Sequence, residues 1–132
     1  VTLREGNDVT IIAAGTMVYI SLKTAELLEE KGISSKVINM HTIKPLDTTA
    51  IKKAAEKTKL LITIEEHSVI GGLGSAVSEY ISTSNANTSL EIIGLPDKYG
   101  NSGAYKDLLE NQGLSEQKLA KKILNRLKSI IK

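Results

Sequence analysis

The chain has 132 residues, the size of one domain, which is enough to bury an apolar core without metal ions or disulfide bonds. Its 17 basic and 15 acidic side chains leave a net charge of +2, a balance that does not favour nucleic acid or an anionic membrane as a partner. The absence of cysteine excludes thiolate chemistry, and the absence of tryptophan and phenylalanine disfavours a surface that stacks nucleic-acid bases.

Targeting and membrane segments are not expected in this sequence. No apolar run approaches the roughly 20 residues of a membrane span, and no signal peptide precedes the first strand-like segment. Together with the lack of cysteine, these features favour a cytoplasmic protein. The sequence begins at Val1 without a methionine and looks ordered at once, so we expect it to be a piece of a longer protein.

The first half of the chain is predicted to alternate between strands and helices. Apolar runs and helical spacing indicate, in order, an edge strand, a strand, a helix, a strand and a second helix: Val1–Leu3, Asp8–Ala14, Met17–Lys31, Lys36–Met40 and a segment capped by Asp47. The first helix has one apolar face, made by Val18, Leu22, Ala25 and Leu28. Gly32 stands where a left-handed C-cap belongs.

The second half continues the alternation. It is predicted to contain a strand, a helix, a polar loop, a strand, a short helix and a last helix: Leu60–Glu66, a segment from about Ser75, Ser82–Ser89, Leu90–Leu95, a segment that contains Leu108 and Leu109, and a segment capped by Ser115. The last helix has one apolar face, made by Leu119, Ile123, Leu127 and Ile130. Alternating strands and helices predict an α/β fold with a mainly parallel sheet covered on both sides.

The junction between the central strand and the next helix is the first place to look for chemistry. The apolar run Leu60–Ile64 suits a strand buried on both faces, and Glu65, Glu66 and His67 end it abruptly. A glycine turn, residues 71–75 with the sequence GGLGS, then leads into helical spacing. Ligands of open α/β sheets collect beyond the carboxyl ends of the strands, where this junction lies.

The acidic end of the central strand has two interpretations. Glu65, Glu66 and His67 are neighbours, so at most two of them can point to one face of the strand. A glutamate with a histidine is suited to general acid and base chemistry. The alternative, which we favour, is that these are polar residues that end a strand and bond to nearby backbone amides. His41 is the other histidine, and no close ligand spacing accompanies it, so we expect no metal site.

The glycine turn also has two interpretations. Gly72 and Gly74 match the first two glycines of the pattern GxGxxG, but Val77 takes the place of the third. The acidic residue expected about 20 positions later is not at the end of the next strand. We therefore favour glycines that let the strand and the helix pack closely, with an anion at the helix N-terminus as the alternative.

The last helix is rich in basic residues, and Glu116 is its only acid. Its basic residues are Lys118, Lys121, Lys122, Arg126, Lys128 and Lys132. An amphipathic helix needs a hydrated face, so we interpret these residues as solvated. No GxSxG or phosphate-binding P-loop motif occurs in the sequence.

Three motifs together resemble the C-terminal domain of transketolase-like, thiamine-diphosphate-dependent enzymes. They are VINMHTIKPLD at Val37–Asp47, TIEEHSVIGGLGSAVSEYI at Thr63–Ile81 and LPDKYGNSGAYKDLLENQGL at Leu95–Leu114, in the family's order and spacing. The middle motif is most similar to the separately encoded C-terminal section of split transketolases. The 1-deoxyxylulose-5-phosphate synthases and the β subunits of 2-oxoacid dehydrogenases are similar through the same sheet and remain alternatives.

This resemblance implies a fold. It implies one domain over residues 1–132, with α/β/α layers around a five-stranded, mostly parallel mixed sheet of strand order 1-3-2-4-5. Strand 1 would be antiparallel, which fits Val1–Leu3. The strands Asp8–Ala14 and Leu60–Glu66 would then be central neighbours.

The resemblance also implies where the cofactor is. In the family, thiamine diphosphate and Mg²⁺ lie between the two preceding domains, which supply their ligands. No catalytic, cofactor-binding or metal-binding residue is therefore expected in this chain. The intact enzyme would be a dimeric transferase of the pentose phosphate pathway that moves a two-carbon ketol unit between sugar phosphates. This chain would be inert alone, would pack against the pyrimidine- and pyrophosphate-binding domains or subunit, and would support a homo-oligomer.

A competing hypothesis gives the strand ends a binding role of their own. The proposed crevice holds a small anion or a regulatory metabolite and consists of Thr16, Glu66, His67, Gly72, Gly74 and Ser75. Apolar residues at the end of the last helix, Leu127, Ile130 and Ile131, are instead candidates for packing against a neighbouring domain.

Overall fold

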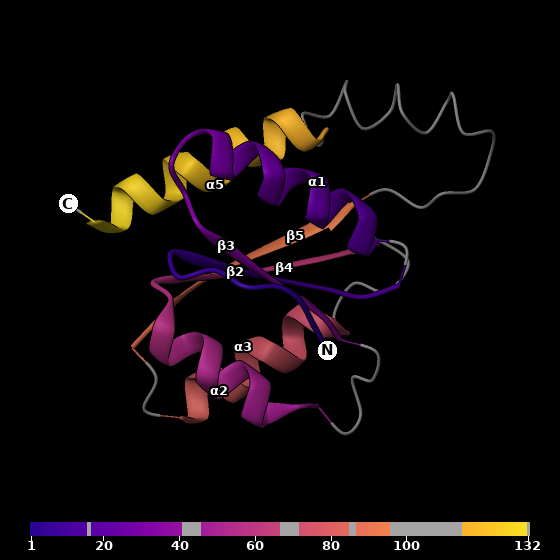
Figure 1. Ribbon diagram of the computed structural model, residues 1–132. Coiled ribbons are helices and arrows are strands. Elements are labelled where there is room, and N and C mark those ends of the chain that lie inside the picture. The colour runs from indigo at the N-terminus through magenta and orange to yellow at the C-terminus, as the bar shows by residue number, and fades with distance from the viewer. Residues whose placement is uncertain (16, 41–45, 67–71, 85–86, 96–114, 132) are drawn as a thin grey trace.

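The computed structural model describes residues 1–15, 17–40, 46–66, 72–84, 87–95 and 115–131. Strands and helices alternate along the chain from an N-terminal edge strand to a C-terminal helix (Figure 1). Their bounds are β1 Thr2–Arg4, β2 Val9–Ala13, α1 Met17–Glu30, β3 Ser35–Asn39, α2 Thr48–Lys57, β4 Leu60–Glu66, α3 Leu73–Thr83, β5 Ser89–Leu95 and α5 Glu116–Ile131.

The strands form one five-stranded mixed sheet with the order β1-β3-β2-β4-β5. Strand β1 is antiparallel to β3, and the other neighbouring strands are parallel. Strands β2 and β4 are central neighbours, with Ala13 paired to Ile64 near their carboxyl ends. The predicted strand order and the antiparallel first strand are therefore confirmed.

One face of the sheet is covered by α1 and α5 (Figure 1). Alternate residues of the strands point to this face, and most are aliphatic and fully buried. The main contributors from the sheet are Val9, Ile11, Ala13, Val37, Leu60, Ile62, Ile64 and Ile93. The helices add Leu28, Leu119, Ile123 and Leu127, so the apolar faces predicted from helical spacing do face the core.

The opposite face is covered by α2 and α3 (Figure 1). Ile12, Ile38 and Leu61 from the sheet pack there against Ile51 of α2 and Val77 of α3. Helical layers on both faces give a three-layer α/β/α domain. Since both faces of β2 and β4 are covered, their buried residues are mostly aliphatic, with Thr10, Thr63 and Glu65 as the buried polar exceptions.

Local signals set several helix ends. The Asp47 carboxylate accepts a hydrogen bond from the amide of Ala50 at 3.1 Å and caps α2, as predicted. The Ser115 hydroxyl accepts one from the amide of Lys118 at 3.4 Å at the start of α5. Gly32 follows α1 with φ of 82°, the left-handed conformation expected of a C-cap glycine.

The predicted loop at Ser82–Ser89 is wrong at both ends. Helix α3 continues to Thr83, and β5 already begins at Ser89. The hydroxyls of Ser82 and Thr83 donate hydrogen bonds to the carbonyl oxygen of Glu79. Polar residues that look like loop residues in the sequence therefore bond to the backbone of the last helical turn. The short helix predicted around Leu108 and Leu109 lies outside the described residues. Within the described ranges, no helix is long and apolar enough to cross a membrane.

Candidate functional site

The β4–α3 junction is built around a buried glutamate. Thr63 and Glu65 alternate with the residues that face α1 and α5, so both point toward α3. Only 2% of Glu65 is exposed. The amide of Gly74, in the first turn of α3, donates a hydrogen bond of 2.6 Å to Oε2 of Glu65. The carboxyl group of Glu65 thus caps a helix that begins eight positions later in the chain.

Gly74 is required at this contact because the backbone of α3 approaches the sheet closely. A Cβ atom on Gly74 would lie 2.7 Å from Cγ2 of Ile92, 3.0 Å from Oε2 of Glu65 and 3.3 Å from Oγ1 of Thr63. The first of these distances is shorter than real carbon contacts allow. The structure thus supports close strand and helix packing as the role of this glycine.

Two buried oxygen atoms beside this contact have no hydrogen-bond partner among the described residues. They are Oε1 of Glu65 and Oγ1 of Thr63. Among the described residues, no basic side chain forms an ion pair with Glu65. The positive end of the α3 dipole and the amide of Gly74 are therefore the groups seen to stabilise its charge.

The predicted crevice is only partly covered by the described residues. Thr16 and His67 lie outside them, and the side chain of Glu66, the last residue of β4, is not described. Gly72 is the N-cap residue of α3, Gly74 is buried, and Ser75 is exposed in the same helical turn. The structure therefore brings the last three together, and the crevice as a whole stays a prediction.

Glu65 is absent from the predicted crevice, although its carboxylate accepts the hydrogen bond that joins β4 to the first turn of α3. The sequence placed Glu65 among the residues that end the strand and bond to nearby amides, and this interpretation is correct for Glu65. Counting by two from the buried Leu61 would have placed Glu65 on the α3 side, if that side had been known.

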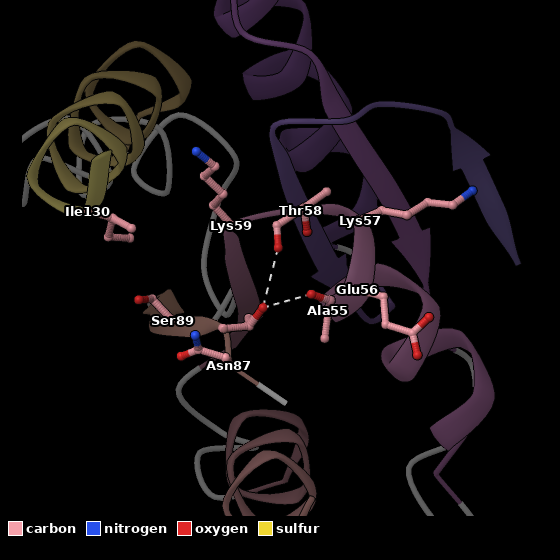
Figure 2. A pocket seen from close by; sticks show the side chains of 9 residues that line it. Ala55, Glu56, Lys57, Thr58, Lys59, Asn87, Ser89 and Ile130 are labelled. Atoms are coloured by element: carbon pink, nitrogen blue, oxygen red, sulfur yellow. Dashed lines mark hydrogen bonds between the residues drawn. The ribbon is translucent and has the colours of Figure 1, made fainter. Parts of the chain in front are cut away.

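A hollow lies at the amino edge of the sheet, opposite the β4–α3 junction (Figure 2). Its volume is about 450 Å³, and its lining is mainly polar: Ala55, Glu56, Lys57, Thr58, Lys59, Asn87, Thr88, Ser89 and Ile130. The hydroxyl of Thr88 reaches the carbonyl oxygens of Ala55 at 2.8 Å and Thr58 at 3.3 Å, which ties β5 to the end of α2.

The charged groups of this hollow do not converge. Figure 2 shows the side chains of Lys57 and Lys59 extending away from each other, with Glu56 directed to the outside. The hollow also adjoins the C-terminal end of α2, whose carbonyl groups disfavour an anion. Ile130, which the sequence suggests as a contact with another domain, is partly buried against the core of this domain. Part of its apolar surface is therefore already covered within the chain. We assign the hollow no ligand.

The basic face of α5 differs from the prediction. Nε of Arg126 lies 3.2 Å from Oε1 of Glu91, and Nζ of Lys122 lies 3.9 Å from Oε2. These two cations connect α5 to strand β5, so they are not simply solvated. Among the described residues, no group of three or more histidine, aspartate or glutamate side chains is arranged to hold a metal ion.

A mixed sheet of order β1-β3-β2-β4-β5 between two helical layers defines the class of protein as a three-layer α/β domain. The family model described as transketolase, C-terminal domain, matches residues 1–119. This chain therefore belongs to the transketolase C-terminal domain family.

Curated relatives agree with this family. A putative transketolase C-terminal section of Methanocaldococcus jannaschii is 43% identical over 126 residues, covering 96% of this chain and 39% of the relative. One subunit of an apulose-4-phosphate transketolase of Phocaeicola vulgatus is 42% identical, with coverages of 96% and 40%. A 1-deoxy-D-xylulose-5-phosphate synthase of Heliobacterium modesticaldum is 41% identical, with coverages of 90% and 18%. The chain thus spans two fifths or less of these relatives.

A solved structure shows the same fold. The protein described as a split gene transketolase, inactive beta4 tetramer, superposes with a TM-score of 0.82 and is 38% identical. The match covers 97% of this chain and 42% of that protein.

Proposed function

We propose that residues 1–132 form one domain that braces a thiamine-diphosphate-dependent transketolase whose catalytic residues lie in other domains or in a partner subunit. The observation that carries the proposal is the family match over residues 1–119, combined with coverage of only 39% of the transketolase relative from M. jannaschii. The core formed by α1, α5 and the sheet supports it, because a brace needs a rigid body of its own.

The described residues do not fit the cofactor. A diphosphate needs free amides or cations, and Mg²⁺ needs several oxygen ligands. The buried amide of Gly74 is already bonded to Glu65, and the described residues contain no cluster of three acidic or histidine side chains. We therefore assign thiamine diphosphate and Mg²⁺ to the rest of the intact enzyme.

The reaction of the intact enzyme is the transfer of a two-carbon ketol unit between sugar phosphates. Its partners are the pyrimidine- and pyrophosphate-binding domains or subunit, within a homo-oligomer in the cytoplasm. Names of relatives support this arrangement, since one is called a subunit of a transketolase and another a split gene transketolase. Because one relative is a 1-deoxy-D-xylulose-5-phosphate synthase, an enzyme of that kind is the alternative for the full-length protein.

The test compares the intact enzyme with and without this domain. We expect removal of residues 1–132 from the full-length protein to weaken dimerisation in gel filtration and to raise the Kd for thiamine diphosphate. The isolated 132-residue chain should bind no thiamine diphosphate in a calorimetric titration. Unchanged dimerisation and cofactor affinity after the deletion would contradict the proposal, as would stoichiometric cofactor binding by the isolated chain.

The crevice hypothesis has a separate test. Soaking crystals in phosphate or sugar phosphates should show density next to Gly72 and Ser75 if an anion or metabolite binds there. If no density appears next to Gly72 and Ser75 under these conditions, the bracing role alone is favoured.

A further inference from the structure

The N-terminal end of α3 has the features of an anion site, yet the chain fills it itself. A helix N-terminus offers free amides and the positive end of its dipole, and it attracts carboxylates or phosphates. Here the amide of Gly74 donates to Oε2 of Glu65 at 2.6 Å. This is a short contact, and hydrogen bonds to charged acceptors are shorter than those between neutral groups. The group in the anion position is a side chain supplied by the preceding strand.

Three observations show that the carboxyl group of Glu65 lies in an enclosed place. Glu65 is 2% exposed, and its Oε1 is buried with no hydrogen-bond partner in the part of the chain that the structure describes. The space on the other side of the contact is closed too, since a Cβ on Gly74 would collide with Ile92. Removing the Glu65 side chain beyond Cβ would therefore leave an enclosed cavity with an unpaired amide at one end.

We propose that the α3 N-terminus is a carboxylate-binding site occupied by Glu65, and that a small monocarboxylate binds there when this side chain is shortened. The atoms that Glu65→Ala removes are those of acetate, so acetate and formate match the cavity in size and charge. In the unaltered chain the site is closed to phosphate and other external anions at Gly74. This inference is independent of the proposed function and holds whichever enzyme the chain belongs to.

The first experiment measures rescue of the 132-residue chain by acetate. Glu65→Ala should lower Tm by roughly 5–10 °C, because a buried donor loses its charged partner. Acetate at about ten times its Kd should then raise Tm of the variant by about 4 °C, since the ligand stabilises only the folded state. Sodium chloride at equal ionic strength should have no such effect.

Matched variants separate this site from general salt effects. Glu91→Ala removes a partly exposed carboxylate and opens no enclosed cavity, so acetate should leave its Tm unchanged. Glu65→Gln keeps the shape of the side chain and should be insensitive to acetate as well. Pivalate carries the same charge but is too large for the cavity, and it should not rescue Glu65→Ala.

A measurement on the unaltered chain keeps the proposal testable if Glu65→Ala does not fold. The amide resonance of Gly74 should not move in a titration with inorganic phosphate. A shift of that resonance would overturn the inference and favour the crevice hypothesis instead. Equal acetate responses in Glu65→Ala and Glu91→Ala would also overturn it. Neither result depends on whether the chain supports cofactor binding in a larger enzyme.

Discussion

The two faces of the sheet are built from different side chains. On the face covered by α1 and α5, the central strands present aliphatic residues such as Ile11 and Ile62, which are fully buried. On the face covered by α2 and α3, Thr10, Thr63 and Glu65 are buried among the aliphatic residues. The first face relies on the hydrophobic effect, which is not directional. The second face also includes hydrogen bonds, whose strength depends on geometry.

The directional bonds of the second face connect the sheet to helix ends. The hydroxyls of Thr10 and Thr58 lie 3.0 Å apart, and Thr58 is the C-cap residue of α2. Glu65 likewise connects β4 to the first turn of α3. By contrast, the buried Ser21 of α1 bonds to its own helix, at the carbonyl of Met17. We infer that the aliphatic face supplies most of the stability and the polar face positions the helices that cover it.

The largest expected effect comes from the aliphatic face. Ile62→Ala should reduce the free energy of unfolding by about 2–5 kcal/mol, because it deletes methyl groups from a closed core. Urea denaturation followed by circular dichroism measures this loss. The Gly74 amide should keep its resonance in the variant, because α3 does not rest on that face.

Ile92→Ala is the matched control for this loss. Ile92 is 49% exposed, so the same truncation there should cost less than about 1.5 kcal/mol. Similar losses in the two variants would break the comparison, because stability would then not depend on the aliphatic face.

A smaller effect, with a different signature, should come from the polar face. Gly74→Ala introduces the Cβ that would contact Ile92 and Glu65, so overpacking should cost about 1–3 kcal/mol. The new methyl group should displace the start of α3 and weaken the bond to Glu65. Faster amide hydrogen exchange at the start of α3 would show this displacement.

Ser75→Ala provides the neighbouring control. Ser75 is exposed and alanine is the better helix former, so this variant should be neutral or more stable by up to about 0.5 kcal/mol. If Gly74→Ala behaves like Ser75→Ala, the close approach of α3 to the sheet does not restrict residue 74. The polar face would then have no positioning role at this end.

The sequence predicts the architecture better than it predicts the polar contacts. Helical spacing in α1 and α5, the cap at Asp47 and the glycine at Gly32 each report on nearby residues, and the structure confirms them. The strand order came from the resemblance to a family, because apolar runs alone do not specify which strands pair.

The contact of Glu65 with Gly74 could not be predicted from local sequence patterns. Thr63 is the only polar residue of β4 before Glu65, and it points to the same face as Glu65. This alternation marks the more polar face of the strand, but it does not say which helix covers that face. The sequence therefore could not say which of the two adjacent glutamates faces α3. The register of β4 under the first turn of α3 decides this, and that register is a tertiary property.

The prediction that the basic residues of α5 are only solvated was wrong for a related reason. Nothing within the helix sequence indicates that β5 is the edge strand beside it, with Glu91 within reach of Lys122 and Arg126. The pattern of charges along a helix predicts which side is wet, but it does not identify partners on another element.

The smallest expected effect tests this last contact, at the edge of the aliphatic face. The side chains of Glu91 and Arg126 are 25% and 40% exposed, so water screens their attraction. A double-mutant cycle with Glu91→Ala and Arg126→Ala should give a coupling energy of about 0.2–1 kcal/mol, falling further at about 1 M salt.

Lys121→Ala serves as the control cation in this cycle, because Lys121 is exposed on the same helix and no ion pair with Glu91 is seen for it among the described residues. Its coupling to Glu91→Ala should be near zero. A coupling of Glu91 with Arg126 that exceeds about 2 kcal/mol and resists salt would be too large for a screened surface pair. Electrostatic attraction, and not aliphatic packing alone, would then hold α5 against the sheet. The aliphatic face would then also depend on a directional polar contact at β5. The assignment of stability to one face and helix positioning to the other would not hold there.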